Sequence, residues 1–146
     1  MTYENPWRYD NGNEEKIIDV DDTIDFLGFV YLITNMKTKQ KYIGKKLFTS
    51  AKSKKLKGKK RKTRYRVQSD WQQYYGSSAD LIADVEKYGV DNFKRRVLRL
   101  CKTKGECSYF EAKYIFDWDA LLDPLYYNKW LSVRVRSEHF KHLMKE

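Results

Sequence analysis

The chain is 146 residues long, 41% of its residues are hydrophobic, and its formal net charge at pH 7 is +10. This length predicts one domain with a buried core, and the chain has no apolar run long enough to cross a membrane. Its two cysteines are too few for a disulfide framework or a zinc site, so the sequence favours buried thiols in a reducing cytoplasm.

The first 26 residues form an acidic segment, which we expect to be an N-terminal extension of a single domain over residues 27–146. It has neither the basic start nor the apolar stretch of a secretory signal. Asn5-Pro6 and Asn11-Gly12 favour loop structure here. Its carboxylates could hold a metal ion, but a solvated segment that balances basic charge elsewhere is favoured. The clustered carboxylates are Asp19, Asp21, Asp22 and Asp25.

Residues 28–46 have the pattern of a β-hairpin. The run GFVYLI is aromatic and β-branched, as strands prefer, and a polar loop separates it from a second strand-like run, KYI. Gly44 then interrupts this second strand, and a glycine inside a strand often marks the close approach of another group. Taken alone, the pattern is equally typical of a two-stranded piece of core in which Tyr31 and Tyr42 only pack.

The most basic part of the chain follows this hairpin. Residues 45–66 contain nine lysines, three arginines and no acidic residue. We predict that residues 47–70 form an inserted basic loop, mobile when nothing is bound, because its middle has little to bury and repels itself. Such a segment is typical of proteins that contact nucleic-acid phosphates. The candidate DNA-binding residues here are Lys45, Lys57, Lys59, Lys60, Arg61 and Lys62.

A first helix is predicted over residues 78–88, where apolar residues fall at helical spacing. Ser77 or Ser78 can cap its N-terminus, because a hydroxyl satisfies free backbone N–H groups. Gly89 is typical of a helix end.

A third strand is predicted over residues 94–101, where the sequence alternates. Arg95, Val97 and Arg99 would share one face of this strand. We expect that face to be partly solvated or near a substrate, because it carries two arginines.

A second helix is predicted over residues 104–118. Glu111 lies on the apolar stripe of this helix, because it is four residues from apolar positions on either side. A carboxylate in that place is costly to bury without a partner. It could form a salt bridge with Arg95 or Arg99, which its position alone favours, or it could bind a metal ion at the edge of a cleft.

The C-terminal part begins with a turn that leads to Asn128, a residue that can cap whatever follows it. Residues 130–136 alternate with a period of two, which predicts an edge strand or an extended arm. Arg134 and Arg136 in this arm are further candidates for DNA contacts. Residues 138–146 are predicted to form a short terminal helix.

The order of these features resembles that of the GIY-YIG nuclease family. Phe29-Val30-Tyr31 looks like a degenerate form of the first motif, in which Gly-Ile-Tyr has become Phe-Val-Tyr, and Tyr42-Ile43-Gly44 is a literal copy of the second. The resemblance covers roughly residues 28–130. It implies an α/β (α+β) domain with a three-stranded antiparallel sheet flanked by helices. It also implies a divalent-metal-dependent DNA endonuclease, similar to freestanding phage and homing-type enzymes.

The resemblance further implies roles for individual residues. Tyr31 would be the general base, Tyr42 would support it, Glu111 would bind Mg²⁺ or Mn²⁺, and Asn128 matches the asparagine that follows the glutamate helix. A tyrosine is a poor base at its ordinary pKa near 10, so a nearby cation must favour its phenolate. We expect Lys45 and Lys46 to do so.

Two residues of the family pattern lack a counterpart, an arginine and the histidine sometimes found one turn after it. The family carries an arginine on its first helix, and the helix predicted over residues 78–88 contains none. The candidates to replace it are Arg66 and then Arg64, with Lys46 as a substitute cation.

Two other functions remain open on the sequence. The chain could be a non-catalytic nucleic-acid-binding module of the same fold, or an interaction domain whose basic loop meets an acidic protein. DNA is the expected partner and no membrane contact is expected. The oligomeric state stays open, although a monomer is compatible with the sequence, and a phage-encoded protein would act in the host cytoplasm.

Overall fold

The computed structural model describes residues 5–10, 15–58 and 60–144, which form a mixed α/β fold. Its main sheet has five strands in the order β2-β1-β7-β3-β4, and the pairs β7-β3 and β3-β4 are antiparallel. The predicted three-stranded core is therefore present, but the sheet is larger than predicted. The strands are β1 (Arg8–Asp10), β2 (Glu15–Ile17), β3 (Gly28–Asn35), β4 (Lys41–Leu47) and β7 (Phe93–Cys101).

The two additional strands come from the acidic segment, for which loop structure was predicted. β1 pairs with β7 in parallel and with β2 in antiparallel orientation. Just before β1, Trp7 is 1% exposed and packs against Phe29 of β3 with ring centroids 4.9 Å apart. The prediction of a loop was wrong because three-residue strands carry no periodicity and are held by their pairing partner. The domain boundary at residue 26 stays a prediction.

The acidic cluster in this segment has a local structural role. Asp19 caps the 3₁₀ turn Val20–Thr23 by accepting a hydrogen bond from the Asp21 N–H, at 3.0 Å. In the part of the chain that the structure describes, no group of three or more His, Cys, Asp or Glu side chains could hold a metal ion. Asp19, Asp21 and Asp25 are exposed, as expected for the solvated segment that the sequence favours.

Two helices pack against opposite faces of the sheet. α1 (Ala79–Tyr88) begins at the Ser78 cap and ends at Gly89, whose φ is +87°. α2 (Lys104–Asp117) begins at Thr103, whose hydroxyl accepts from the Glu106 N–H. Both predicted helices are confirmed. No helix within the described ranges has the length and apolar character needed to cross a membrane.

The core lies on both faces because β3 alternates with a period of two. Phe29, Tyr31 and Ile33 point to the face covered by α1, and all three are at most 1% exposed. Val30 points to the face covered by α2, where Ile43 of β4 and Ile115 of α2 join it. The strand therefore holds Tyr31 firmly on the α1 side of the sheet.

A register shift in the pairing of β3 with β7 changes which side chains of β7 lie on each face of the sheet. The shift occurs opposite Val30 and Tyr31, and it places both Leu98 and Arg99 on the α2 side. Arg95 instead points to the α1 side and is only 1% exposed, between the rings of Trp7 and Tyr75. The prediction that Arg95 and Arg99 share a face was therefore wrong. The prediction of a partly solvated face was wrong for the face that carries Arg95.

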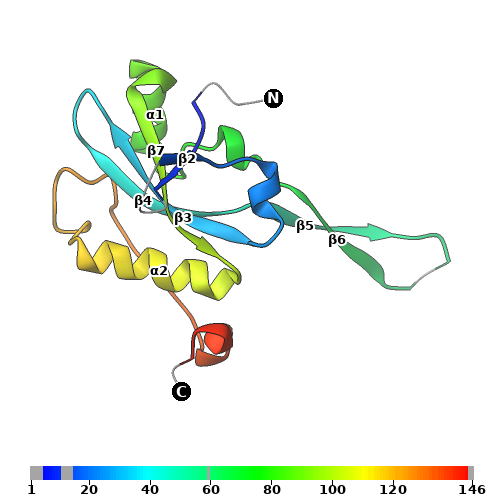
Figure 1. Cartoon of the computed structure of the whole chain (residues 1–146). Helices are drawn as coiled ribbons and strands as arrows, with labels where there is room; N and C mark the ends of the chain where they lie inside the picture. The colour runs from blue at the N-terminus through cyan, green and yellow to red at the C-terminus, as the bar shows by residue number, and fades with distance from the viewer. Residues whose placement is uncertain (1–4, 11–14, 59, 145–146) are drawn as a thin grey trace.

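The basic segment forms a second, two-stranded sheet and is not the mobile loop that we predicted. β5 (Thr49–Lys55) pairs along its full length with β6 (Lys62–Gln68). The hairpin extends away from the main sheet (Figure 1). The prediction rested on charge repulsion and overlooked the backbone hydrogen bonds of the paired strands. Lys59 lies outside the described residues.

The C-terminal arm adds no strand to either sheet. Residues 129–136 run as an irregular segment, so the alternative of an extended arm describes them. The arm ends in the 3₁₀ turn Ser137–Leu143, which docks beside the start of α2. There His142 lies 3.2 Å from both carboxylate oxygens of Glu106.

Candidate active site

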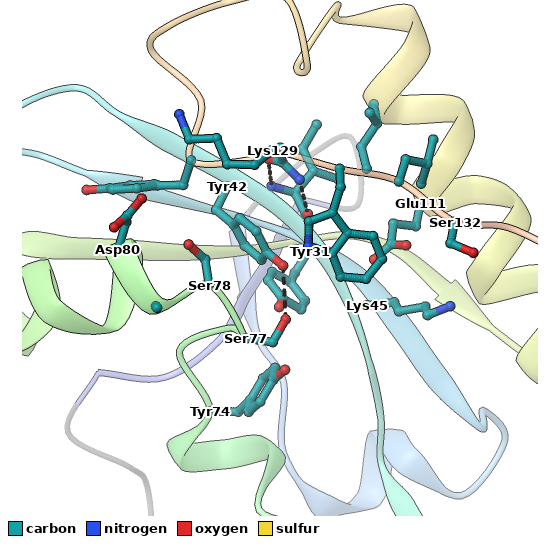
Figure 2. Close-up of a pocket in the computed structure, with 17 residues that line it drawn as sticks. Tyr31, Tyr42, Lys45, Tyr74, Ser77, Ser78, Asp80, Glu111, Lys129 and Ser132 are labelled. Atoms are coloured by element: carbon teal, nitrogen blue, oxygen red, sulfur yellow. Dashed lines mark hydrogen bonds between the residues drawn. The ribbon is translucent and has the colours of Figure 1, made fainter.

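A cavity of about 580 Å³ lies where the edge strand β4 meets α2 and the C-terminal arm. Its lining residues come from β3, β4, the segment before α1, the first turn of α1, α2 and residues 127–132 (Figure 2). The volume is in the range of ligand sites. Four of the residues singled out by the family resemblance line this cavity, namely Tyr31, Tyr42, Glu111 and Asn128.

The close approach predicted at Gly44 is made by Tyr31. The two residues are directly paired across β3 and β4. A Cβ atom at position 44 would lie 2.5 Å from the Tyr31 Cζ atom and would also clash with its hydroxyl. Only glycine leaves this space, so Gly44 allows the Tyr31 ring to cross β4 and reach the cavity.

The surroundings of the Tyr31 hydroxyl disfavour its ionised form. Burial raises its pKa well above the ordinary value of 10, and the neighbouring Tyr74, Tyr42 and Glu111 raise it further. The two lysines are engaged elsewhere, since Lys45 donates to Ser108 and Lys46 pairs with Asp70. The prediction that they favour the phenolate is therefore not supported.

Tyr42 is held at the cavity by a serine that the sequence analysis named only as a helix cap. Its hydroxyl lies 3.1 Å from the Ser77 Oγ atom (Figure 2). Burial raises the Tyr42 pKa, while the hydrogen bond with Ser77 lowers it. Gly76, at φ +91°, packs against the Tyr42 ring. The turn before α1 thus orients this tyrosine.

Glu111 reaches the cavity from the middle of α2. Burial raises its pKa, and Lys45 partly opposes the shift. The salt-bridge alternative is not found, because Arg95 donates to the backbone of Tyr74 and the Arg99 guanidinium lies 3.9 Å from Glu106. Within the described residues, Glu111 forms no ion pair.

The donor set at Glu111 fits a hard divalent cation. A desolvated carboxylate without an ion pair gains from a cation beside it. Mg²⁺ prefers oxygen ligands, keeps several of its waters and needs only one or two carboxylates. Glu111, on the wall of a cavity that also holds the tyrosine hydroxyls, meets that requirement.

Asn128 lines the cavity, but its side chain is fully engaged with the backbone of β4. Its Oδ1 atom accepts from the Ile43 N–H at 3.0 Å, and its Nδ2 atom donates to the Ile43 carbonyl at 2.9 Å. Next to it, the Tyr127 N–H donates to the Lys41 carbonyl at 2.7 Å. Asn128 therefore continues the pairing of the edge strand and positions the Tyr42-Ile43-Gly44 motif.

Asn128→Ala is expected to destabilise the protein. The substitution leaves the buried N–H and carbonyl of Ile43 without partners, at a cost of about 1–3 kcal/mol for each unsatisfied group. Denaturant unfolding would measure the reduction in the free energy of unfolding. Gln73→Ala, at an exposed position, is the control and should change stability little. Equal stability of the Asn128→Ala variant and the parent would contradict the positioning role.

The three cations proposed to replace the family arginine do not line the cavity. Lys46 pairs with Asp70 at 2.7 Å and lies over the Tyr74 ring. Arg66 donates to Thr49, and Arg64 lies farther along the exposed hairpin. The reason is that β6 pairs with β5 and so carries both arginines away from the main sheet. Their placement does not support a catalytic role.

The cavity instead has lysines as its basic lining residues, Lys45 and Lys129. Lys45 donates to Ser108 on α2 at 2.7 Å, which places it beside Glu111. From the sequence, Lys45 was expected to contact DNA and to favour the Tyr31 phenolate, and Lys129 was not singled out. A signal for Lys129 was present, since it directly follows Asn128.

Among the aromatic residues that line the cavity, Tyr74, Tyr127 and Trp130 were also missed. Tyr74 contacts Tyr31 with ring centroids 6.1 Å apart, and Trp130 lines the rim with 78% of its surface exposed. Tyr74 precedes the Gly76 turn, and Trp130 begins the predicted arm. Neither position carries a local pattern that separates a site residue from a packing residue.

The remaining candidates for DNA contacts are at the surface. Lys57, Lys60, Arg61 and Lys62 are exposed around the hairpin tip. Arg134 and Arg136 are exposed on the C-terminal arm, where Arg136 pairs with Glu138 at 3.2 Å. These side chains are placed where a large anionic partner can reach them.

Comparison with known families gives one match. The family model described as "Putative endonuclease segE, GIY-YIG domain" matches residues 7–131. The matched range contains both tyrosine motifs, Glu111 and Asn128, and it also includes β1 and β2. Searches of curated proteins and of solved structures found no match.

Proposed function

Because the chain belongs to the SegE-type GIY-YIG domain family, we propose that it is a divalent-metal-dependent DNA endonuclease that hydrolyses phosphodiester bonds. Its relation to freestanding phage and homing-type enzymes is part of this proposal. The observation that supports it best is the convergence on one cavity of two tyrosines and a carboxylate that forms no ion pair with the residues described. Hydrolysis needs a base for water and positive charge for the phosphate, and the cavity can supply both.

In this proposal each residue of the cavity has a separate task. Tyr31, as the phenolate, accepts the proton of the attacking water while the bond from phosphorus to the leaving oxygen breaks. Tyr42 orients the water from its place beside Ser77. Lys45 and Lys129 bind the phosphate oxygens, a task that the family arginine would otherwise perform.

Glu111 is the proposed ligand of the cation. A divalent cation held there would supply positive charge to the leaving oxygen and would favour the Tyr31 phenolate. Lys45 lies beside the same carboxylate and partly opposes the rise that burial causes in its pKa. The site therefore gathers positive charge around one anionic ligand, as phosphate transfer requires.

A plasmid nicking assay tests the proposal. Supercoiled DNA should be converted to nicked or linear forms in the presence of Mg²⁺ or Mn²⁺, and EDTA should stop the reaction. Salt-sensitive DNA binding without cleavage would instead favour a non-catalytic nucleic-acid-binding module. The absence of both would favour an interaction domain with an acidic protein partner.

The tip of the hairpin is expected to bind phosphates. Replacing Lys57, Lys60 and Arg61 by serine should weaken binding to all duplexes alike, because lysines and arginines that bind phosphates release counterions. The slope of log K against log salt should become shallower by up to about 0.9 for each phosphate that the variant no longer neutralises. Fluorescence anisotropy over a range of salt concentrations measures this slope.

The control removes the same charge elsewhere. Lys16, Lys37 and Lys87 are exposed on β2, the β3–β4 turn and α1, and their replacement by serine should leave the slope nearly unchanged. If the two triple variants change the slope equally, then binding depends on net charge alone and the hairpin has no special part in it.

A further inference from the structure

The β5–β6 hairpin has a paired backbone but almost nothing packed on it. Both strands are seven residues long, and their residues from Ala51 to Lys55 and from Lys62 to Arg66 are all exposed. An isolated two-stranded hairpin is marginally stable in water. An exposed, strongly basic ribbon that projects from the body (Figure 1) therefore has the form of a binding element.

The root of the hairpin is anchored in the core. Phe48, which precedes β5, is fully buried and stacks on Phe29 with ring centroids 4.9 Å apart. Trp71, which follows β6, is 1% exposed and packs edge-on against Phe48. The Ser69 N–H donates to the Phe48 carbonyl at 2.9 Å. The core therefore sets the direction in which the ribbon leaves the domain.

The two faces of the ribbon differ, because directly paired residues share a face. We call one the arginine face, and on it the small residues Ala51 and Ser53 lie opposite Arg66 and Arg64. The other, the tyrosine face, has Lys52 opposite Tyr65 and Lys54 opposite Thr63. The small residues of β5 leave room for another surface to approach the arginine face closely.

The two arginines of this face are held differently. Arg66 is tied to the root, since its Nε and Nη2 atoms donate to the Thr49 hydroxyl and carbonyl at 2.7 and 2.9 Å. Arg64 is exposed and has no hydrogen-bond or ion-pair partner among the residues that the structure describes. Its planar guanidinium is therefore free to form paired hydrogen bonds with a ligand.

We propose that this hairpin enters the major groove of duplex DNA with its arginine face toward the base pairs, and that Arg64 reads a guanine there. A two-stranded ribbon fits the major groove, about 12 Å wide, but not the minor groove of about 6 Å. Arginine pairs with the O6 and N7 atoms of guanine, the commonest specific contact. The inference rests on the proposed function for its substrate, and it adds a specificity-determining residue.

The connection to the cavity limits where the reading occurs. Lys45 of β4 lines the cavity. Ser53 of β5, which is paired with Arg64, lies eight residues later, and only one residue separates β4 from β5 along the chain. Eight residues span at most about 27 Å at roughly 3.3 Å each. That length corresponds to about eight base pairs. The base preference should therefore lie within about one helical turn of the cleaved bond.

Groove-selective competitors test the docking without any mutation. Binding of the whole protein to a duplex is measured in EDTA, so that cleavage cannot interfere, while methyl green or netropsin is added. Methyl green, which occupies the major groove, should displace the protein, and netropsin, which occupies the minor groove, should not. Displacement by netropsin, or by neither compound, overturns the groove assignment.

Selection from a random duplex library, again in EDTA, tests the role of Arg64. The wild type should select a guanine at one position, and Arg64→Lys should weaken that preference on the order of 10- to 100-fold. The variant keeps its charge, so its salt slope should not change. Arg96→Lys, an exposed arginine on β7, is the matched control. A guanine preference that survives in Arg64→Lys, or is absent in the wild type, overturns the inference.

The two proposals can fail separately. A protein that binds the major groove with an Arg64-dependent preference but does not nick DNA in Mg²⁺ contradicts only the endonuclease proposal. A protein that nicks DNA while its Arg64→Lys variant keeps every base preference contradicts only the inference about the hairpin.

Discussion

Glu111→Gln should abolish metal-dependent cleavage while duplex binding in EDTA stays intact. The substitution keeps the volume of the side chain but removes the charge that we propose to hold the cation. A bound cation contributes several kcal/mol to the transition state, which corresponds to a decrease of roughly 10³-fold or more in rate. Plasmid nicking and anisotropy measure the two activities on the same preparation.

A second readout of the same variant does not depend on activity. Burial raises the pKa of Glu111 in the folded protein. Ionisation of Glu111 therefore lowers the free energy of unfolding. This loss grows as the pH rises from the pKa of Glu111 in the unfolded chain to its pKa in the folded protein. At neutral pH without metal, Glu111→Gln should be at least as stable as the parent. Added Mg²⁺ should raise the melting temperature of the parent only.

Glu86→Gln provides the matched control for this experiment. Glu86 is an exposed residue of α1, and its neutralisation should change neither the nicking rate nor the response to Mg²⁺. Cleavage by Glu111→Gln at the rate of the parent would show that the carboxylate on α2 is not the metal ligand.

Tyr31→Phe is expected to lower the cleavage rate by about 10²–10⁴-fold, the usual range for the removal of a general base. The fold should persist, because the phenylalanine ring can keep the contacts with Trp7 and Phe29. Tyr42→Phe should have a smaller effect, because we assign it an orienting role. Single-turnover cleavage at saturating DNA separates this chemical effect from binding.

The pH dependence gives a sharper test of Tyr31. Since burial raises its pKa above 10 in the free protein, the phenolate fraction grows with pH throughout the neutral range. The cleavage rate of the parent should therefore rise with pH, and this rise should vanish in Tyr31→Phe. Tyr109→Phe, at an exposed position on α2, should keep it. An identical pH profile in Tyr31→Phe and the parent would reduce Tyr31 to a packing residue.

Local patterns in the sequence were enough to predict the central elements. The runs on either side of the polar loop formed β3 and β4, and serine and glycine marked the ends of α1. The tyrosines were singled out as site residues by the family resemblance, because the hairpin pattern alone is equally typical of tyrosines that only pack. Tyr31 and Gly44 meet across a single hairpin, so the distance between them along the chain is short and the register is local. The same resemblance favoured the metal-ligand alternative for Glu111 over a salt bridge, and it added Asn128, which the local sequence marks only as a possible cap.

The faces on which the arginines of β7 lie depended on tertiary structure. Strict alternation would put Arg95 and Arg99 on one face, but a shift in the ladder opposite Val30 and Tyr31 turns them to opposite faces, as a bulge does. Arg95 then lies in the core between two aromatic rings. A bulge depends on how two distant strands pair, so the alternation of residues in either strand does not reveal it.

The same dependence on distant partners explains why the hairpin form of the basic segment was not predicted. It also explains why the arginines expected at the site lie outside the cavity. A mobile loop was predicted for residues 47–70 from their composition, because a dense run of like charges repels itself. Whether its backbone pairs with itself depends on cross-strand hydrogen bonds and on the aromatic anchors Phe48 and Trp71 at the root. That pairing carries Arg64 and Arg66 out of the cavity and leaves Lys45 and Lys129 there. The sequence was sufficient where neighbours along the chain interact, and tertiary structure decided wherever the partner lies far away.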